Sequence, residues 1–289
     1  MSILVDEQTR LLVQGITGQQ GTLHTRLMLE YGTNIVAGVT PGRGGQRVCD
    51  VPVFDTVAEA CERTRPNVSI IFVPAMTTRD AAFEAITARL PLITIITEHV
   101  PIHDMLRIRA HAARHGVRLI GPNGIGAISP GKTKVGIMPG MLYGQGSVGI
   151  VSRSGTLTHE TASLLRDRGF GNSTCVGIGG DPIHGIGFVD ALDLFASDPD
   201  TALVVILGEI GGGDEEQAAA YLSARKYPKP VLAYVAGRLA PPEKRMGHAG
   251  AIVRQGTGTA QAKMAALRHA GVHVASSLKE LTHEIAARL

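Results

Sequence analysis

The sequence predicts two successive α/β domains, an N-terminal Rossmann-like domain over residues 1–122 and a C-terminal flavodoxin-like domain over residues 147–289. Short apolar runs of strand length alternate with segments of helical periodicity, as in parallel sheets covered by helices. The 36 glycines gather where the apolar runs end, which is typical of α/β proteins whose strand-to-helix turns approach ligands. The alternation stops once along the chain and then restarts, and this interruption separates the domains.

The first series has the spacing of a doubly wound parallel sheet. Buried strands are predicted at Leu11–Val13, Ile35–Val39, Val68–Val73, Leu92–Ile96 and Val117–Ile120. Helices are predicted at Gly21–Tyr31, ended by Gly32, and at Thr78–Arg89 and Ile102–His115.

Between the two series, residues 123–146 are rich in glycine and proline. We interpret this stretch as a linker that wraps across the surface. A long functional loop inside one domain is the alternative interpretation.

The alternation then resumes with the same spacing. The second series has strands at Val148–Val151, Ser173–Val176, Leu203–Leu207 and Val231–Val235, with helices at Leu157–Arg168, Phe188–Ala196, Glu215–Arg225 and Thr259–Ala270.

Composition excludes several classes of protein. No apolar run approaches the ~20 residues of a membrane helix, and the first residues reach acid at Asp6 without the basic head of a signal peptide. The 3 cysteines lack metal-ligand spacing, which favours reduced thiols, a cytoplasmic location and no metal site. With 4% aromatic residues, no tryptophan and a net charge of +3, nucleic acid is not an expected partner.

The turn after the first strand has the character of a phosphate site. Gly15, Gly18 and Gly21 recur at every third position where backbone N–H groups and a helix start attract anions. The spacing differs from the G-x-G-x-x-G of dinucleotide folds, and Arg43 follows the second strand where a nicotinamide site would have an acid. A cation there suits the extra phosphate of coenzyme A or NADP, although a solvated loop cation is also possible. Ile96, Thr97 and Glu98 end the fourth strand at the same crevice.

A second strand–turn–helix transition contains Ser154, Gly155 and Thr156. The spacing is not that of a nucleophile elbow, which disfavours a serine hydrolase. Ser154 and Thr156 are good helix caps, and a capped helix start is also an anion site.

The third feature is His248, which lies between glycines and follows Lys244 and Arg245. We expect the glycine turns to hold phosphates and His248 to carry a phosphoryl group between them. Glu209 follows an apolar strand and precedes three glycines, so it suits a carboxylate that orients the imidazole. Asp181 could perform the same task, and a surface histidine in a flexible loop is the plainer alternative.

Seven sequence blocks together resemble the succinyl-CoA synthetase α-subunit family from Met1 to the last helix. The blocks are Gly15–Gly21, Val39–Gly45, Gly121–Asn123, Ser152–Leu157, Gly177–Pro182, Gly208–Gly212 and Arg245–Ala251. The resemblance implies an enzyme that converts a small dicarboxylic acid, coenzyme A and ATP or GTP with Mg²⁺ into acyl-CoA, nucleoside diphosphate and phosphate. It also implies a β-subunit partner that binds the nucleotide, in an αβ or α₂β₂ assembly.

The resemblance further implies roles for individual residues. His248 would be phosphorylated and Glu209 would orient it, while Ser154, Gly155 and Thr156 would bind the phosphoryl group. Coenzyme A would contact Thr17, Gly18, Gln19, Gln20, Gly21, Arg43, Ile96, Thr97 and Glu98, with Asn123 near its thiol end.

Three positions depart from the family pattern. Arg43 replaces a lysine, Gly124 stands where the family usually has cysteine, and His159 where it has tyrosine. The last two would adjoin the acyl site, so malate, itaconate or another dicarboxylate is an alternative to succinate. A CoA-binding regulatory protein without turnover and an NADP-dependent oxidoreductase are the other two hypotheses.

Overall fold

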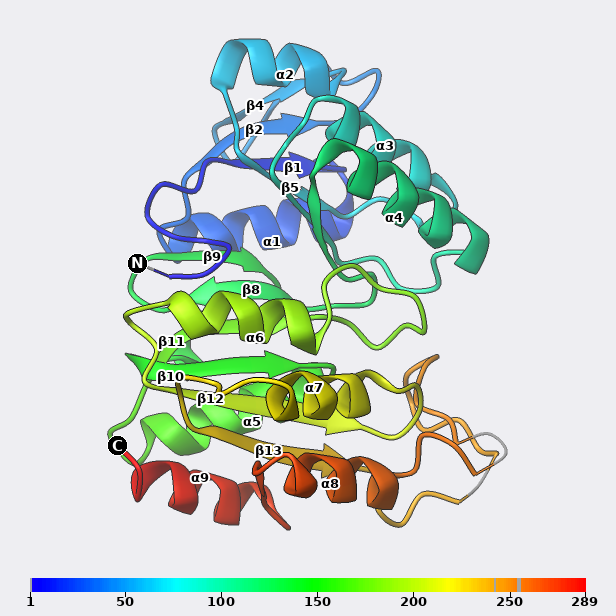
Figure 1. Ribbon diagram of the computed structural model, residues 1–289. Coiled ribbons are helices and arrows are strands. Elements are labelled where there is room, and N and C mark those ends of the chain that lie inside the picture. The colour runs from blue at the N-terminus through cyan, green and yellow to red at the C-terminus, as the bar shows by residue number, and fades with distance from the viewer. Residues whose placement is uncertain (1, 242, 254–255) are drawn as a thin grey trace.

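Two sheets of seven strands each organise the described residues. The computed structural model describes residues 2–241, 243–253 and 256–289. Figure 1 shows the sheets one above the other, each with helices on both faces. The predicted fold class, two α/β units in succession, is therefore confirmed.

The first sheet has the strand order β3-β4-β2-β1-β5-β6-β7 and is parallel except for β3, which pairs antiparallel with β4. Its strands are β1 (Leu11–Gln14), β2 (Ile35–Val39), β3 (Arg47–Val48), β4 (Val51–Phe54), β5 (Val68–Ile71), β6 (Leu92–Ile95) and β7 (Arg118–Ile120). Its helices are α1 (Gln19–Glu30), α2 (Val57–Thr64), α3 (Thr78–Thr87) and α4 (Ile102–His115), with a 3-10 turn, η1, at Ala75–Thr77.

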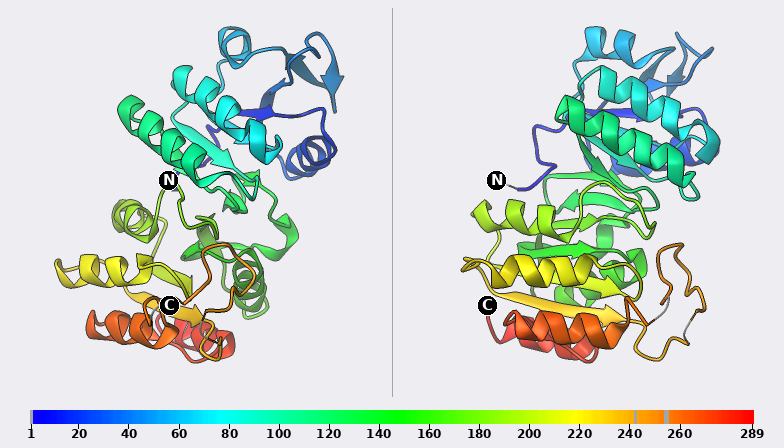
Figure 2. Two further views of the ribbon diagram at one scale, coloured as in Figure 1. Left: turned by 90° about the vertical axis from the view of Figure 1, so that its right-hand side faces the viewer. Right: turned by 45° about the vertical axis from the view of Figure 1, so that its right-hand side comes forward.

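Strand alternation explains why helices cover both faces of this sheet. Leu11 and Val13 pack in one core with Met28 of α1. Leu12, between them, points the other way and packs with α2, α3 and α4, for example with Ile86 of α3 and Ile108 of α4. Apolar residues at successive positions are thus needed because both faces are buried. Figure 2 shows α1 on one side of the sheet and α3 and α4 on the other.

The second sheet has the order β14-β13-β12-β10-β11-β8-β9. Its strands are β8 (Gly126–Ser129), β9 (Thr133–Gly136), β10 (Gln145–Ser152), β11 (Asn172–Gly177), β12 (Leu203–Glu209), β13 (Val231–Ala236) and β14 (His273–Val274). Its helices are α5 (Gly155–Arg166), α6 (Phe188–Ser197), α7 (Asp214–Ser223), α8 (Ala260–His269) and α9 (Leu278–Ala286), with a 3-10 turn, η2, at Gly140–Leu142.

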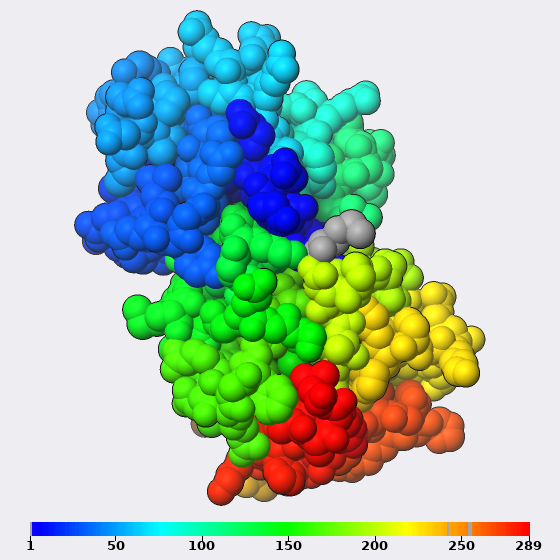
Figure 3. Space-filling model, turned by 90° about the vertical axis from the view of Figure 1, so that its left-hand side faces the viewer, coloured from blue at the N-terminus to red at the C-terminus, as the bar shows by residue number. Residues whose placement is uncertain are grey.

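Here too the core divides by face. The cluster that contains Ile150 includes Leu165 of α5 and Leu281 of α9. The neighbouring residue Val151 belongs to the cluster that includes α6, α7 and α8. On the face shown in Figure 3, the last helix (red) lies beside the green segment that contains α5.

The interpretation of residues 123–146 as a surface linker was wrong. These residues include the hairpin β8–β9, which extends the second sheet because β8 pairs antiparallel with β11. The hairpin also contacts the first domain, where Thr33 Oγ1 donates a hydrogen bond to the Lys134 carbonyl at 2.7 Å. The segment thus forms part of the packed junction between the sheets. Within the described residues, no helix is long and apolar enough to cross a membrane.

Candidate active site

Glu209 and His248 form a hydrogen-bonded pair at the end of β12. Nδ1 of His248 lies 3.0 Å from Oε1 and 2.9 Å from Oε2 of the Glu209 carboxylate. Because a carboxylate only accepts, Nδ1 carries the proton and donates it. Nε2 is thereby left as the nitrogen with a free lone pair when the ring is neutral.

Both side chains are largely shielded from solvent. The Glu209 side chain is 10% exposed and that of His248 29%. The hydrogen bond that His248 donates to Glu209 raises the pKa of His248 above its ordinary value, and burial of the ring opposes this rise. The pair therefore favours a protonated ring more than solvent does.

The backbone of Glu209 is held in place by the ion pair between Glu215 and Lys263. The Glu209 N–H donates to Oε1 of Glu215 at 3.0 Å, and Glu215 is paired with Lys263. Nζ of Lys263 also donates to the Gly211 carbonyl at 2.5 Å. Glu215 of α7 and Lys263 of α8 are both 0% exposed. The turn after β12 is therefore held by a fully buried ion pair.

The turn after β11 approaches the His248 side chain so closely at Gly180 that a larger residue there would require one of the two to shift. A Cβ at Gly180 would lie 2.4 Å from Cγ of His248. Asp181 follows it but does not pair with His248, because its Oδ1 accepts a hydrogen bond from Asn123 Nδ2 at 3.0 Å. Of the two carboxylates considered from the sequence, Glu209 is the one in contact with the imidazole.

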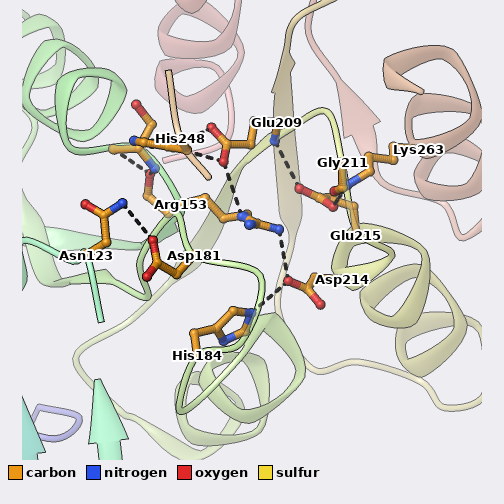
Figure 4. Close-up of polar contacts among 12 residues, drawn as sticks. Asn123, Arg153, Asp181, His184, Glu209, Gly211, Asp214, Glu215, His248 and Lys263 are labelled. Atoms are coloured by element: carbon orange, nitrogen blue, oxygen red, sulfur yellow. Dashed lines mark hydrogen bonds and ion pairs between the residues drawn. The ribbon is translucent and has the colours of Figure 1, made fainter. Parts of the chain in front are cut away.

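Arg153, which was not among the predicted site residues, lies next to this pair. Its Nε is 3.4 Å from Glu209 Oε1, and its Nη1 is 3.2 Å from Asp214 Oδ2. The same Asp214 oxygen lies 2.9 Å from Nε2 of His184. Figure 4 shows these side chains in one continuous line of polar contacts from His248 to His184. The arginine in the Ser-Arg-Ser-Gly-Thr turn is the sequence feature that could have identified this residue. Its burial could not be predicted, because Arg153 is buried by contacts with residues far away in sequence.

A cleft of about 730 Å³ leads from the start of α1 to His248. Many of the residues selected from the sequence line it: Gly18, Gln19, Gln20, Ile96, Thr97, Glu98, Asn123, Gly124, Gly155, Thr156 and His248. Residues not foreseen also line it, among them Phe72, Ile125 and His24, whose ring stacks on that of Phe72 at 5.4 Å. The cleft therefore joins elements of both sheets.

Other selected residues lie outside this lining. Thr17 lines an adjoining hollow of about 500 Å³ together with Gly18 and Thr40. Gly21 is buried, and a Cβ there would lie 2.1 Å from the Gly15 carbonyl, so this glycine serves helix packing. Arg43 is exposed in the loop after β2 and is not among the described residues that line the cleft.

Two helix starts face the cleft, and both suit an anion. Gly18 caps α1 without a side chain, and the first turn of α1 contains no acidic residue. Ser154 caps α5 by accepting a hydrogen bond from the Leu157 N–H at 3.3 Å. At each of these starts, backbone N–H groups and the helix dipole attract negative charge.

Of the three positions that depart from the family pattern, Gly124 and His159 have clear local surroundings. A Cβ at Gly124 would lie 2.7 Å from the Gly177 carbonyl oxygen, so the backbone here requires glycine. His159 lies within α5, and its Nδ1 is 2.5 Å from the Tyr143 hydroxyl. Burial lowers the pKa of His159, which favours a neutral ring.

The family comparisons match both parts of the chain. The model described as CoA binding domain matches residues 6–99, and the model described as CoA-ligase matches residues 151–273. The first match favours coenzyme A over NADP as the ligand of the first domain. Together the two matches span the turns, the helix starts and the histidine described above.

Close relatives match almost the whole chain. It is 56% identical to succinate–CoA ligase [ADP-forming] subunit alpha of Methanothermobacter thermautotrophicus, covering 99% of this chain and 97% of the relative. It is 50% identical to the protein of the same name from Aquifex aeolicus, covering 99% and 94%.

Among solved structures, the chain resembles ATP citrate lyase of Methanosaeta concilii, solved with (3S)-citryl-CoA, with a TM-score of 0.90 and 26% identity. The match covers 99% of this chain and only 50% of the lyase chain, so this chain corresponds to half of that protein.

Proposed function

The chain belongs to the family of succinate–CoA ligase alpha subunits, and from this premise we propose that it works as the alpha subunit of an ADP-forming acid–CoA ligase. The reaction joins a carboxylate to coenzyme A while ATP becomes ADP and phosphate. The observation that supports this proposal best is the His248–Glu209 pair, because it leaves one imidazole nitrogen available as a nucleophile at the end of a cleft.

In the first step, Nε2 of His248 attacks the terminal phosphorus of ATP, and ADP leaves. The ring becomes positively charged as the N–P bond forms, and the Glu209 carboxylate stabilises it through the proton on Nδ1. A carboxylate oxygen of the acid then attacks the same phosphorus, which releases His248 and forms an acyl phosphate. Finally, the thiol sulfur of coenzyme A attacks the acyl carbon and expels phosphate.

The start of α5 is the proposed site for the phosphoryl group on His248. Gly155 and Thr156 line the same cleft as His248, and Ser154 caps the helix. A helix start offers N–H donors and a positive dipole end to the phosphoryl oxygens. These contacts require no change in the protonation of a side chain during transfer.

The start of α1 is the proposed site for the phosphates of coenzyme A. Thr17, Gly18, Gln19, Gln20 and Gly21 form or precede its first turn, which lacks acidic side chains. When bound, coenzyme A supplies the thiol nucleophile. Ile96, Thr97 and Glu98 would contact it along the cleft, and Asn123 would lie near the thiol end. Arg43, exposed on its loop, would add a cation at the outer end.

Succinate is the acid that the names of the relatives favour, and ATP is the nucleotide. The nucleotide and Mg²⁺ would be bound by a beta subunit, in an αβ or α₂β₂ assembly. The acyl group would lie near Gly124, which lines the cleft, and near His159, whose Nε2 would lie 4.0 Å from a Cβ at Gly155 of the same cleft; malate and itaconate are therefore the related acids to compare with succinate. A cytoplasmic location remains a prediction.

The proposal is tested by combining the chain with its beta subunit, Mg²⁺, ATP and coenzyme A. A panel of succinate, malate and itaconate is then assayed for ADP release that depends on coenzyme A. Turnover with one of these acids, abolished in His248→Ala, supports the proposal. Tight binding of coenzyme A without ADP release from any acid would instead indicate a regulatory protein.

A further inference from the structure

Arg153 is a buried cation between two carboxylates. Its side chain is 2% exposed, and it reaches Glu209 through Nε and Asp214 through Nη1. The contact of Nε with Glu209 has the distance of an ion pair but not the geometry of a hydrogen bond. Glu209 therefore keeps its hydrogen bonds with His248 while its charge is balanced by Arg153.

The loop that carries His248 closes directly over the Arg153 guanidinium. A Cβ at Gly250 would lie 2.6 Å from Nη2 of Arg153, and one at Gly212 would lie 3.4 Å from Nη1. The Gly250 N–H also donates to the Gly180 carbonyl at 2.9 Å, which holds this part of the loop in place. The guanidinium thus contacts the partner of His248 and the loop that presents His248.

Asp214 holds the Arg153 guanidinium at Nη1, away from the Nε contact with Glu209. Asp214, at the start of α7, contacts both Nη1 of Arg153 and Nε2 of His184. His184 is buried, and its Nδ1 donates to the Ile186 carbonyl at 3.1 Å. With both ring nitrogens in contact with acceptors, His184 fixes Asp214, and Asp214 fixes the guanidinium.

We propose that Arg153 is a positioning residue for phosphoryl transfer: its positive charge balances the Glu209 carboxylate that fixes Nδ1 of His248 and opposes a second proton on the ring, which keeps Nε2 free to attack phosphorus. This inference rests on the proposed function. Arg153 acts through Glu209 and does not itself contact the phosphoryl group.

The charges around His248 determine the direction in which each neighbour shifts its pKa. Glu209 and, more weakly, Asp181 raise the pKa of His248, whereas Arg153 lowers it. Lys244 and Arg245, on the loop of His248 itself, are exposed to solvent. Adding a proton to Nε2 places a positive ring near a buried guanidinium, and this repulsion opposes protonation. Removing Arg153 should therefore raise the pKa of His248, while neutralising Asp214 should lower it by leaving Arg153 less compensated.

The test measures the pKa of His248 directly. The full chain with ¹³C-labelled histidine is titrated by NMR, and the His248 signal is identified by its loss in His248→Asn. We expect Arg153→Met to raise the pKa and Asp214→Asn to lower it. Arg153→Lys, which keeps the charge, should stay near the wild-type value, and Arg118→Met, exposed on β7, should match it. An unchanged or lowered pKa in Arg153→Met would overturn the inference.

Phosphorylation by the beta subunit with ATP and Mg²⁺ is then measured on the same proteins. We expect Arg153→Met to be phosphorylated on the order of tenfold more slowly than wild type at pH 6.5, with a smaller deficit at high pH, because each pH unit below the pKa removes tenfold of the neutral ring. Arg153→Lys should recover part of the rate. A rate deficit independent of pH would reduce Arg153 to a structural role and overturn the inference.

The two experiments separate this inference from the proposed function. If wild-type His248 is not phosphorylated but its pKa responds to Arg153 as expected, the ligase proposal fails and the electrostatic role stands. If wild type is phosphorylated and the pKa does not respond, only the role of Arg153 fails. Loss of a buried ion-pair partner can prevent folding. In that case the decision rests on Arg153→Lys, which keeps the charge and should leave the pKa of His248 near the wild-type value, and on Asp214→Asn, which removes a negative charge and should lower it; an unchanged or raised pKa in Asp214→Asn would overturn the inference.

Discussion

Both carboxylate oxygens of Glu209 accept a hydrogen bond from Nδ1 of His248, at 3.0 and 2.9 Å. Glu209 therefore determines which imidazole nitrogen is free to react. The loop of His248 and the strand of Glu209 are far apart in sequence and meet only through the fold. The reactive nitrogen, Nε2, is therefore selected by tertiary structure.

The first prediction concerns Glu209→Gln. The amide can donate to Nδ1, which would favour the tautomer with its proton on Nε2 and block attack on phosphorus. We expect phosphorylation of His248 to slow by about 10²-fold or more. The measurement is the initial rate of acid-labile, base-stable phosphate formation. Glu62→Gln, exposed on α2, is the matched control and should behave as wild type; an equal loss there would point to a general effect of the substitution.

The second prediction concerns pH. The pKa of His248 is raised above its ordinary value, first by the hydrogen bond that its Nδ1 donates to Glu209. The neutral, nucleophilic ring is populated above that raised pKa, so phosphorylation should be fastest at high pH and fall as the pH drops through it. Single-turnover rates across pH measure this, with Tm at each pH as the control for unfolding. A rate that increases as the pH falls through this range is the contrary result.

Gly250→Ala provides a prediction about stability. The added methyl would lie 2.6 Å from Nη2 of the buried Arg153, so the guanidinium or the His248 loop must shift. We expect a loss of about 1–3 kcal/mol from overpacking, with Tm lower by about 2–4 °C per kcal/mol. Gly144→Ala, whose methyl would meet its nearest atom at 3.6 Å, is the control and should change little. Equal melting temperatures for the two variants would show that the close contact is not a constraint.

Gln20→Glu separates binding of coenzyme A from stability. Gln20 is exposed in the first turn of α1 and lines the cleft. A negative charge there repels phosphates yet suits the helix dipole, so coenzyme A should bind on the order of tenfold more weakly while Tm is unchanged or higher. Isothermal titration calorimetry at two salt concentrations measures the effect, with Gln8→Glu as the exposed control. Unaltered affinity would place the phosphates elsewhere.

Much of the fold was predictable because strands buried on both faces are continuous apolar runs. Leu11–Val13 of β1 is such a run, and each of its residues is buried. The hairpin at 126–136 was missed because its strands are short and β8 is stabilised by pairing with β11, about fifty residues away in sequence. The composition of residues 123–146 does not reveal that pairing, and their many glycines and prolines are typical of a linker.

The glycine turns show a similar limit. They were predicted to hold phosphates, and the turns before α1 and α5 do line the cleft. Gly180 and Gly250, however, leave space for the ring of His248 and for the guanidinium of Arg153. The sequence does not distinguish a glycine that leaves space for a ligand from one that leaves space for another side chain. Arg153 was missed for the same reason, since a charged residue in a turn indicates exposure until its partners at Glu209 and Asp214 are known.

The most direct test of the account is to locate the phosphoryl group after the chain, its beta subunit, Mg²⁺ and ATP have reacted. We predict one phosphohistidine at His248, attached through Nε2, which disappears when succinate and coenzyme A are added. A phosphoryl group on Nδ1 of that ring, or on any residue of a His248→Ala chain, would contradict the account.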